Sequence, residues 1–161
     1  MDPLIQASDL AGFRGAPFSA EVAESAAQSI RTECGWHIAP SEIETVKLRG
    51  GSSVLLLPSM HVTAVSSVVD SYGNAVIGWE WFPSGVMEYA AGFPLFVSVT
   101  FTHGWPACPA ELLPIIAERA MSQASGRVRS ESAGGVSISL EGGDDPGTSR
   151  VLAKYRLQGG A

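Results

Sequence analysis

One stretch organises the second half of the chain: Phe96-Val97-Ser98-Val99-Thr100-Phe101-Thr102-His103-Gly104-Trp105-Pro106. Its apolar residues alternate with serine and threonine, and this period of two predicts a half-buried β-strand. The strand should stop at the Gly-Trp-Pro corner, because glycine permits a left-handed turn and proline lacks the N–H that a ladder needs. An apolar segment follows, so the stretch predicts a strand that leads into a helix.

That helix is expected over residues 109–125, with Gly126 as its stop. Pro114 falls inside this range, where a proline clashes with the carbonyl four residues earlier. Either residues 109–113 form a separate tight turn, or the helix kinks. Small side chains dominate the expected buried stripe, which would let another helix approach closely. The stripe consists of Leu113, Ile116, Ala117, Ala120 and Ala124.

Upstream of the strand, a helix is expected over residues 19–34, because Ser19 is a good N-cap and Gly35 a good C′ residue. From Glu42 the apolar period changes to two, which predicts antiparallel strands as far as residue 102. Strands are expected at 43–48, 53–57, 62–69, 79–82 and 86–89, the first two joined through Gly50-Gly51-Ser52. The fold class is therefore α+β, a helical frame with an inserted β section at 42–102.

Beyond Gly126 the composition becomes small and polar. A strand at 136–140 and a short helix from Thr148 or Ser149 to Arg156 are expected there. Large apolar side chains are too few for this segment to fold alone, so it needs a surface to lie on. The predicted organisation is a core of residues 1–126 and an extended C-terminal arm of residues 127–161.

Composition describes a folded protein, since 45% of the 161 residues are hydrophobic. Charged residues are only 16%, below the roughly 25% of a typical soluble domain, as expected when other chains cover the surface. Residues 1–126 carry 5 basic and 12 acidic side chains, a net −7, while residues 127–161 carry 5 and 4, a net +1. The body should repel nucleic acid. The arm could meet an acidic protein surface, or its charges could simply be solvated.

Several classes of protein are not expected. Cys34 and Cys108 fit no metal-ligand spacing, and no apolar run approaches the ~20 residues of a membrane span. The first residues lack the pattern of a signal peptide, so a reducing cytoplasm is the expected site of synthesis. The Gly-rich stretches lack a following lysine and are not phosphate loops.

The best candidates for a chemical site are His61, His103 and Cys108, and each has a plainer interpretation. His103 lies at a strand end, where an imidazole commonly hydrogen-bonds the turn backbone. Cys108 lies near a helix start, which can lower a thiol pKa, but a Cys–His pair also needs an orienting group and an oxyanion hole. No catalytic residue, metal ligand or cofactor is therefore predicted. An aromatic cluster at Trp79, Trp81, Phe82 and Tyr89 could be core or a hairpin tip that docks on protein.

The order of these signals resembles the head-to-tail connector, or adaptor, proteins of long-tailed bacteriophages, over roughly residues 5–157. The resemblance rests on the N-terminal helix, the proline-started helix and a series of short motifs. The motifs are Gly35-Trp36-His37-Ile38, Leu55-Leu56-Leu57-Pro58, Thr102-His103-Gly104 and Arg129-Ser130-Glu131-Ser132-Ala133-Gly134-Gly135-Val136-Ser137-Ile138. The β insertion departs from the smallest members, which are nearly all helical.

The resemblance implies a structural role without chemistry. Such adaptors form a ring, usually of twelve subunits, beneath the portal of a DNA-filled capsid, and they present a surface to the stopper or tail-side protein. It implies a place in the virion neck after assembly in the host cytoplasm, with genomic DNA passing through the lumen without specific binding. No membrane is involved.

On this hypothesis the arm contacts the portal or a neighbouring subunit. The expected contact residues are Arg127, Arg129, Val136, Ile138, Leu140, Arg150, Lys154, Tyr155 and Arg156. The alternative is a small β-rich carbohydrate- or protein-binding module that uses the Trp79/Trp81 hairpin. Such a module has no use for a long, weakly apolar extension, which favours the adaptor.

Overall fold

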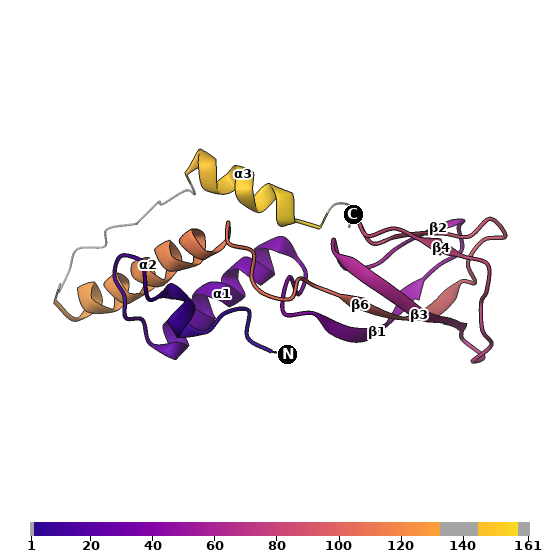
Figure 1. The fold of residues 1–161 in the computed structure, drawn as a ribbon, viewed down its shortest axis with the longest axis horizontal. Coiled ribbons are helices and arrows are strands. Elements are labelled where there is room, and N and C mark those ends of the chain that lie inside the picture. Colours follow the sequence, from indigo (N-terminus) through magenta and orange to yellow (C-terminus); the bar gives the residue numbers. More distant parts are fainter. Residues whose placement is uncertain (1, 133–144, 158–161) are drawn as a thin grey trace. The chain divides into compact units, whose positions relative to one another are not determined.

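The computed structural model describes residues 2–132 and 145–157, and they form two compact units (Figure 1). Of the described residues, a helical unit comprises 2–34, 108–132 and 145–156, and a β unit comprises 35–107 with residue 157. The helices and two antiparallel sheets in these residues confirm the predicted α+β class.

The helical unit is built on α1 (Ala20–Cys34), which packs against α2 (Leu113–Ser132), with the short 3₁₀ helix η1 (Ala7–Leu10) beside both. The prediction of a helix over 19–34 is confirmed to within one residue. The Ser19 hydroxyl accepts a hydrogen bond from the Val22 amide at 3.3 Å, as an N-cap should. Small residues let the two helices approach closely. The buried residues of the contact region include Ala23, Ala26, Ala27, Ile30, Ile116 and Ala120.

The bounds of α2 differ from the predicted 109–125. The Leu112 and Leu113 amides bond to the carbonyls of Pro109 and Ala110, so a separate turn precedes the helix. Pro114 then falls in the first helical turn, where a missing N–H costs nothing. At the other end α2 runs past Gly126 to Ser132. A single interior glycine weakens a helix by about 1 kcal/mol without stopping it, and the predicted boundary after residue 126 therefore lies inside α2.

The last helix, α3 (Pro146–Tyr155), begins earlier than predicted. Asp145 is its N-cap and accepts a hydrogen bond from the Gly147 amide at 3.1 Å, and Pro146 opens the first turn. Leu152 and Tyr155 are buried, and α3 packs on α1. This part of the predicted arm therefore belongs to the helical unit of its own chain. The predicted strand at 136–140 lies outside the described residues.

A partly buried charge cluster ties the three helices together. The Glu33 carboxylate of α1 accepts hydrogen bonds from Arg119 of α2 and from Arg156, which follows α3. Arg119 also donates to the Ser29 hydroxyl at 3.0 Å. Burial acts to raise the pKa of Glu33, but the hydrogen bonds and charges of the two arginines outweigh it and lower that pKa below its usual value.

The β unit contains two three-stranded sheets. In the first, β6 (Phe96–His103) lies between β1 (Glu42–Arg49) and β3 (Val62–Asp70); in the second, β5 (Val86–Glu88) lies between β2 (Val54–Leu56) and β4 (Glu80–Trp81). The predicted strand at 96–102 is confirmed, and Val97, Val99 and Phe101 all face the core. The β4–β5 hairpin also matches prediction.

The pairing of the first strands differs from the expected hairpin. β1 pairs with β6, and β2 pairs with β5, so Gly50-Gly51-Ser52 carries the chain from one sheet to the other. The Gly50 amide donates to the Leu95 carbonyl and the Gly51 amide to the Phe93 carbonyl. These glycines are held by backbone that is distant in sequence, which a local turn pattern cannot reveal.

The corner after β6 is a close backbone approach. Gly104 has φ +90°, and a Cβ atom built there would lie 2.9 Å from the Pro40 carbonyl oxygen. The next amide, that of Trp105, donates to the Ile38 carbonyl at 2.8 Å. Glycine is therefore required at position 104, both because the backbone is left-handed there and because a Cβ atom would clash with the Pro40 carbonyl.

We predict that Gly104→Ala lowers the free energy of unfolding by at least about 2 kcal/mol, because it adds a clash to backbone strain. Gly73→Ala is the matched control: Gly73 has φ +83° but nothing within 4 Å of its built Cβ, so strain alone should cost about 1 kcal/mol. Urea unfolding followed by tryptophan fluorescence measures both. Equal losses in the two variants would show that the contact with Pro40 is unimportant.

We also predict that Glu33→Gln destabilises the chain by about 1–2 kcal/mol at neutral pH. Because folding lowers the pKa of Glu33, this stabilisation is present above the ordinary value of 4.5 and is lost as the pH falls through the folded value. The difference between wild type and variant in urea unfolding should therefore shrink in acid. Glu118→Gln, on exposed α2 surface, is the control. A difference that stays constant with pH would contradict this assignment.

Candidate subunit interfaces

The predicted contact residues fall into three groups in the structure. Arg127 and Arg129 lie on the last turns of α2, Arg150 to Arg156 lie on or just after α3, and the remaining apolar residues lie outside the described part. Those outside are Val136, Ile138 and Leu140. The side chains described among these are those of residues 150–156, on or just after α3.

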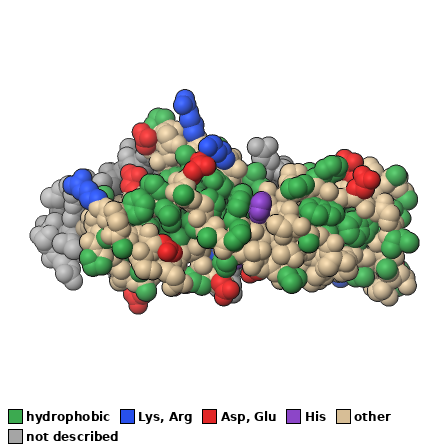
Figure 2. All heavy atoms as spheres, viewed as in Figure 1, with side chains coloured by type: hydrophobic (Ala, Val, Ile, Leu, Met, Phe, Trp, Pro, Cys, Tyr) green, Lys and Arg blue, Asp and Glu red, His purple; other side chains and the backbone are tan. Residues whose placement is uncertain are grey.

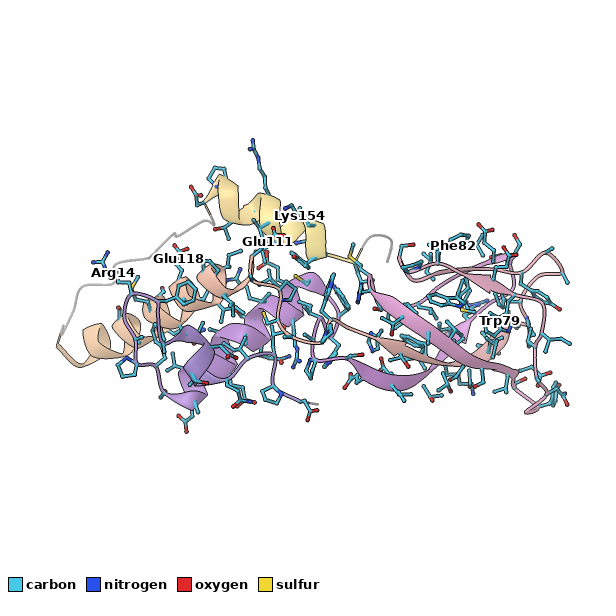
Figure 3. The ribbon with its side chains drawn as sticks, in the orientation of Figure 1. Arg14, Trp79, Phe82, Glu111, Glu118 and Lys154 are labelled. Atoms are coloured by element: carbon cyan, nitrogen blue, oxygen red, sulfur yellow. The ribbon has the colours of Figure 1, made fainter. Side chains whose placement is uncertain are left out.

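The charged side chains of α3 are partly engaged within their own chain. Lys154 Nζ donates to Glu111 Oε2 at 2.8 Å, and Figure 3 shows the two side chains beside each other. This hydrogen bond lowers the pKa of Glu111. Tyr155 is buried and its hydroxyl lies 3.4 Å from Glu111 Oε1. Arg150 is exposed, which makes it the best-placed member of the group for another chain.

The buried position of Tyr155 has a simple cause. It lies three residues after Leu152, so both side chains share the face of α3 that packs inward. Sequence reasoning treated α3 as lying on a foreign surface, whereas its apolar face is covered by its own chain. A contact through α3 would therefore use its opposite, exposed face.

The β unit exposes many large apolar side chains. Figure 2 shows green side chains on the surface of this unit, at the right of the view. Contiguous apolar patches mark surfaces that other proteins cover, whereas apolar side chains scattered singly are normal on any protein. The exposed residues of this unit are Ile43, Val54, Leu56, Tyr72, Ile77, Phe82, Leu95 and Phe96.

The sequence contains a pattern that predicts the exposure of Val54 and Leu56. Val54-Leu55-Leu56-Leu57 is a run of four apolar residues in and beside one strand, and alternate residues of a strand face opposite sides. Leu55 and Leu57 enter the core, and Val54 and Leu56 are 45% and 48% exposed. An uninterrupted apolar run in a short strand thus predicts that one half faces outward.

The tryptophans are less available than the carbohydrate-binding alternative requires. Trp79 and Trp81 are partly buried and pack against the β core, and the Trp79 indole donates to the Val76 carbonyl at 2.7 Å. Tyr89 also packs there, with its ring 5.5 Å from that of Phe93. Phe82, labelled with Trp79 in Figure 3, is the exposed member of the cluster. Trp79, Trp81 and Tyr89 therefore serve mainly as packing for the β core, and of these four described rings Phe82 is the one left exposed.

Two shallow depressions mark the surface of the β unit. One, of about 500 Å³, is lined by residues that include Ser53, Glu80, Glu88 and Tyr89. The other, of about 300 Å³, is lined by residues of β3 and by Trp79. Neither lining contains histidine, cysteine or a basic residue, which gives neither depression an obvious nucleophile or anion-binding group.

The chemical candidates lie in different units. Burial is the main reason that the pKa of the Cys108 thiol rises to about 12, so it remains protonated and a poor nucleophile. His61 stacks on Trp105 with ring centroids 4.5 Å apart. His103 is buried, and burial lowers its pKa although Glu44 and Glu42 act to raise it. Among the described residues, neither unit by itself contains both a cysteine and a histidine.

Among the described helices, none is both long and apolar enough to cross a membrane. No protein-family model matches this chain, and no curated protein sequence matches it. Its similarity to known proteins is found in solved structures.

Two neighbours come from the neck of gene transfer agent (GTA) particles. A chain in the neck of an empty particle, computed with C6 symmetry, aligns with a TM-score of 0.61 at 16% identity, covering 97% of this chain and 93% of that one. A chain in the neck of a native particle, computed with C12 symmetry, aligns with a TM-score of 0.55 at 18% identity, covering 87% and 84%. The chain described here thus shares its fold with chains of phage-like necks.

Proposed function

We propose that this chain is a structural subunit of the neck of a tailed phage or phage-like particle, and specifically the head-to-tail adaptor between the portal and the stopper or tail-side protein. The observation that carries the proposal is the alignment with a neck chain over 97% of this chain and 93% of that one. Both units take part in an alignment of that extent. A similarity confined to one unit would support only a shared domain.

A homo-oligomeric ring is part of the proposal. The neighbouring structures were computed with C6 and C12 symmetry, which supports a ring, and we propose twelve copies. Ring closure needs a heterologous interface, in which one surface of a subunit meets a different surface of the next. The chain offers dissimilar surfaces of this kind, since the helical unit exposes charged α3 and the β unit exposes apolar side chains.

The charge distribution suits a channel that lets DNA slide. Residues 1–126 carry a net −7, so a lumen lined by this part of the chain would repel phosphates rather than hold them. The proposed role requires no catalysis and no cofactor. It places the protein in the virion neck, after assembly in the host cytoplasm.

The proposed portal contact includes the C-terminal residues named above other than the buried Tyr155, with Arg150 as its testable member. Its side chain is exposed on α3. Reversing the charge there should not disturb the apolar face of the helix, which carries Leu152 and Tyr155. The contact can therefore be tested without unfolding the chain.

We predict that the purified chain is monomeric and forms rings only when the matching portal protein is added. Arg150→Glu should weaken this co-assembly about tenfold, because it replaces an attraction with a repulsion. Arg14→Glu, an exposed charge reversal in the same unit, should have little effect (Figure 3). Light scattering on a sizing column, with negative-stain microscopy of the peaks, measures the outcome. Stable rings without portal would refute the need for a template, and no co-assembly would refute the adaptor role.

We further predict little binding of duplex DNA even at low salt. Fluorescence anisotropy of a labelled duplex, titrated with the portal-assembled ring, measures this. A nucleic-acid-binding protein would show a tight complex whose affinity falls steeply with added salt. Such a complex would contradict the sliding-channel part of the proposal.

A further inference from the structure

Three ligating side chains meet at one end of the first sheet of the β unit. Glu42, the first residue of β1, lies directly opposite His103, the last residue of β6. Glu44 follows two residues later and therefore points to the same face of the sheet. Farther along the strands, the same face of the sheet carries Val46, Leu48 and the apolar residues of β6, which pack in the core. The three polar side chains Glu42, Glu44 and His103 therefore lie at the end of an otherwise apolar face.

The separations between the ligating atoms suit a single bound ion. His103 Nε2 lies 3.1 Å from Glu44 Oε2 and 4.0 Å from Glu42 Oε1, and the three atoms all lie within 4.8 Å of one another. Two ligands bound tetrahedrally to Zn²⁺ at about 2.0–2.2 Å are separated by roughly 3.3 Å. The two glutamates are 31% and 43% exposed at their side chains, so small rotations can close the longer separation.

The buried imidazole is the second observation. His103 is 1% exposed, and within the described residues neither of its ring nitrogens makes a hydrogen bond. Buried polar atoms nearly always have a partner, so such a pair of nitrogens needs an explanation. The nearest carboxylate oxygen, Glu44 Oε2, lies 3.1 Å from Nε2 at ion-pair distance, and Nδ1 has no partner among the described residues. A metal ion held between Nε2 and Glu44 Oε2 would give Nε2 a ligand contact, and it would leave Nδ1 unchanged.

His37 is placed to orient the trio. Its Nε2 lies 2.5 Å from the Pro40 carbonyl, which can only accept, so this nitrogen carries the proton. Its Nδ1 lies 3.3 Å from Glu42 Oε1. Carboxylates that bind metals are commonly positioned by a neighbouring side chain of this kind. With its proton on Nε2, His37 can also donate from Nδ1 only when the imidazole is doubly protonated, and in that form it would act as a positioning residue for Glu42.

We propose that Glu42, Glu44 and His103 bind one divalent transition-metal ion, with Zn²⁺ as the best match. One imidazole nitrogen and two carboxylate oxygens are a ligand set that zinc accepts, whereas calcium and magnesium prefer oxygen alone. The exposed side of the two carboxylates leaves room for water as a fourth ligand. The ion would join the start of β1 to the end of β6, and through the Val62–His103 pair to β3.

The consequence is a metal clamp between β1 and β6, the central strand that also pairs with β3. It is a structural site rather than a catalytic one, and it is independent of the neck assignment. The competing explanation is a simple histidine–glutamate ion pair that binds no metal.

The test uses the full chain, with any affinity tag removed, after treatment with EDTA and dialysis. Isothermal titration calorimetry with ZnCl₂ should give one ion per chain with a dissociation constant on the order of micromolar or tighter. Zn²⁺ should also raise the melting temperature. Glu42→Gln and Glu44→Gln should each weaken binding at least about tenfold. Glu88→Gln, an exposed glutamate of the second sheet, is the matched control and should leave binding unchanged.

X-ray absorption at the zinc edge adds a readout that does not depend on any variant. It should show nitrogen and oxygen ligands with the scattering pattern of one imidazole. Because both glutamine variants change exposed carboxylates, circular dichroism should confirm that they fold. No saturable binding, equal binding by the Glu44 and Glu88 variants, or a spectrum without imidazole would each overturn the proposal in favour of the ion pair.

Discussion

The packing of α1 on α2 joins two segments that the whole β unit separates in sequence. The chain leaves the helical unit at Cys34 and returns at Cys108. Closing so long a loop costs conformational entropy, although the cost grows only slowly with length. The packed alanines of the two helices and the hydrogen bond between Glu33 and Arg119 offset this loss of entropy. Without it, α3 would also lose the surface on which it lies.

The β unit is organised by its central strand in a comparable way. β6 pairs with β1 on one side and with β3 on the other, and its alternating apolar residues form much of the core. The strand ends where Gly104 passes close to the Pro40 carbonyl. Each unit thus depends on a contact between segments that are remote in sequence.

Local sequence signals predicted the positions of helices and strands better than they predicted which strands pair with one another. The alternation of β6 and the caps of α1 are properties of neighbouring residues, and the structure reproduces both. The pairing of β1 with β6 depends on register between distant strands, which no local pattern encodes. The same register places Glu42 opposite His103, so the proposed metal ligands could not be grouped from their sequence spacing. The end of α2 was misplaced because one glycine was treated as a stop.

A shared fold narrows the range of functions without fixing one. Here the fold is shared with chains from the neck of gene transfer agent particles. The exposed apolar side chains of the β unit are available for contact with other subunits. The proposed role as an assembly subunit therefore rests on the shared fold and awaits the co-assembly experiment.

The most direct measurement is a cryo-electron microscopy reconstruction of the intact neck of a particle whose genome encodes this chain. The account predicts a closed ring of density next to the portal into which both units fit, with the β unit contacting other protein subunits. A neck whose density is fully explained by other chains, with this one absent, would contradict it.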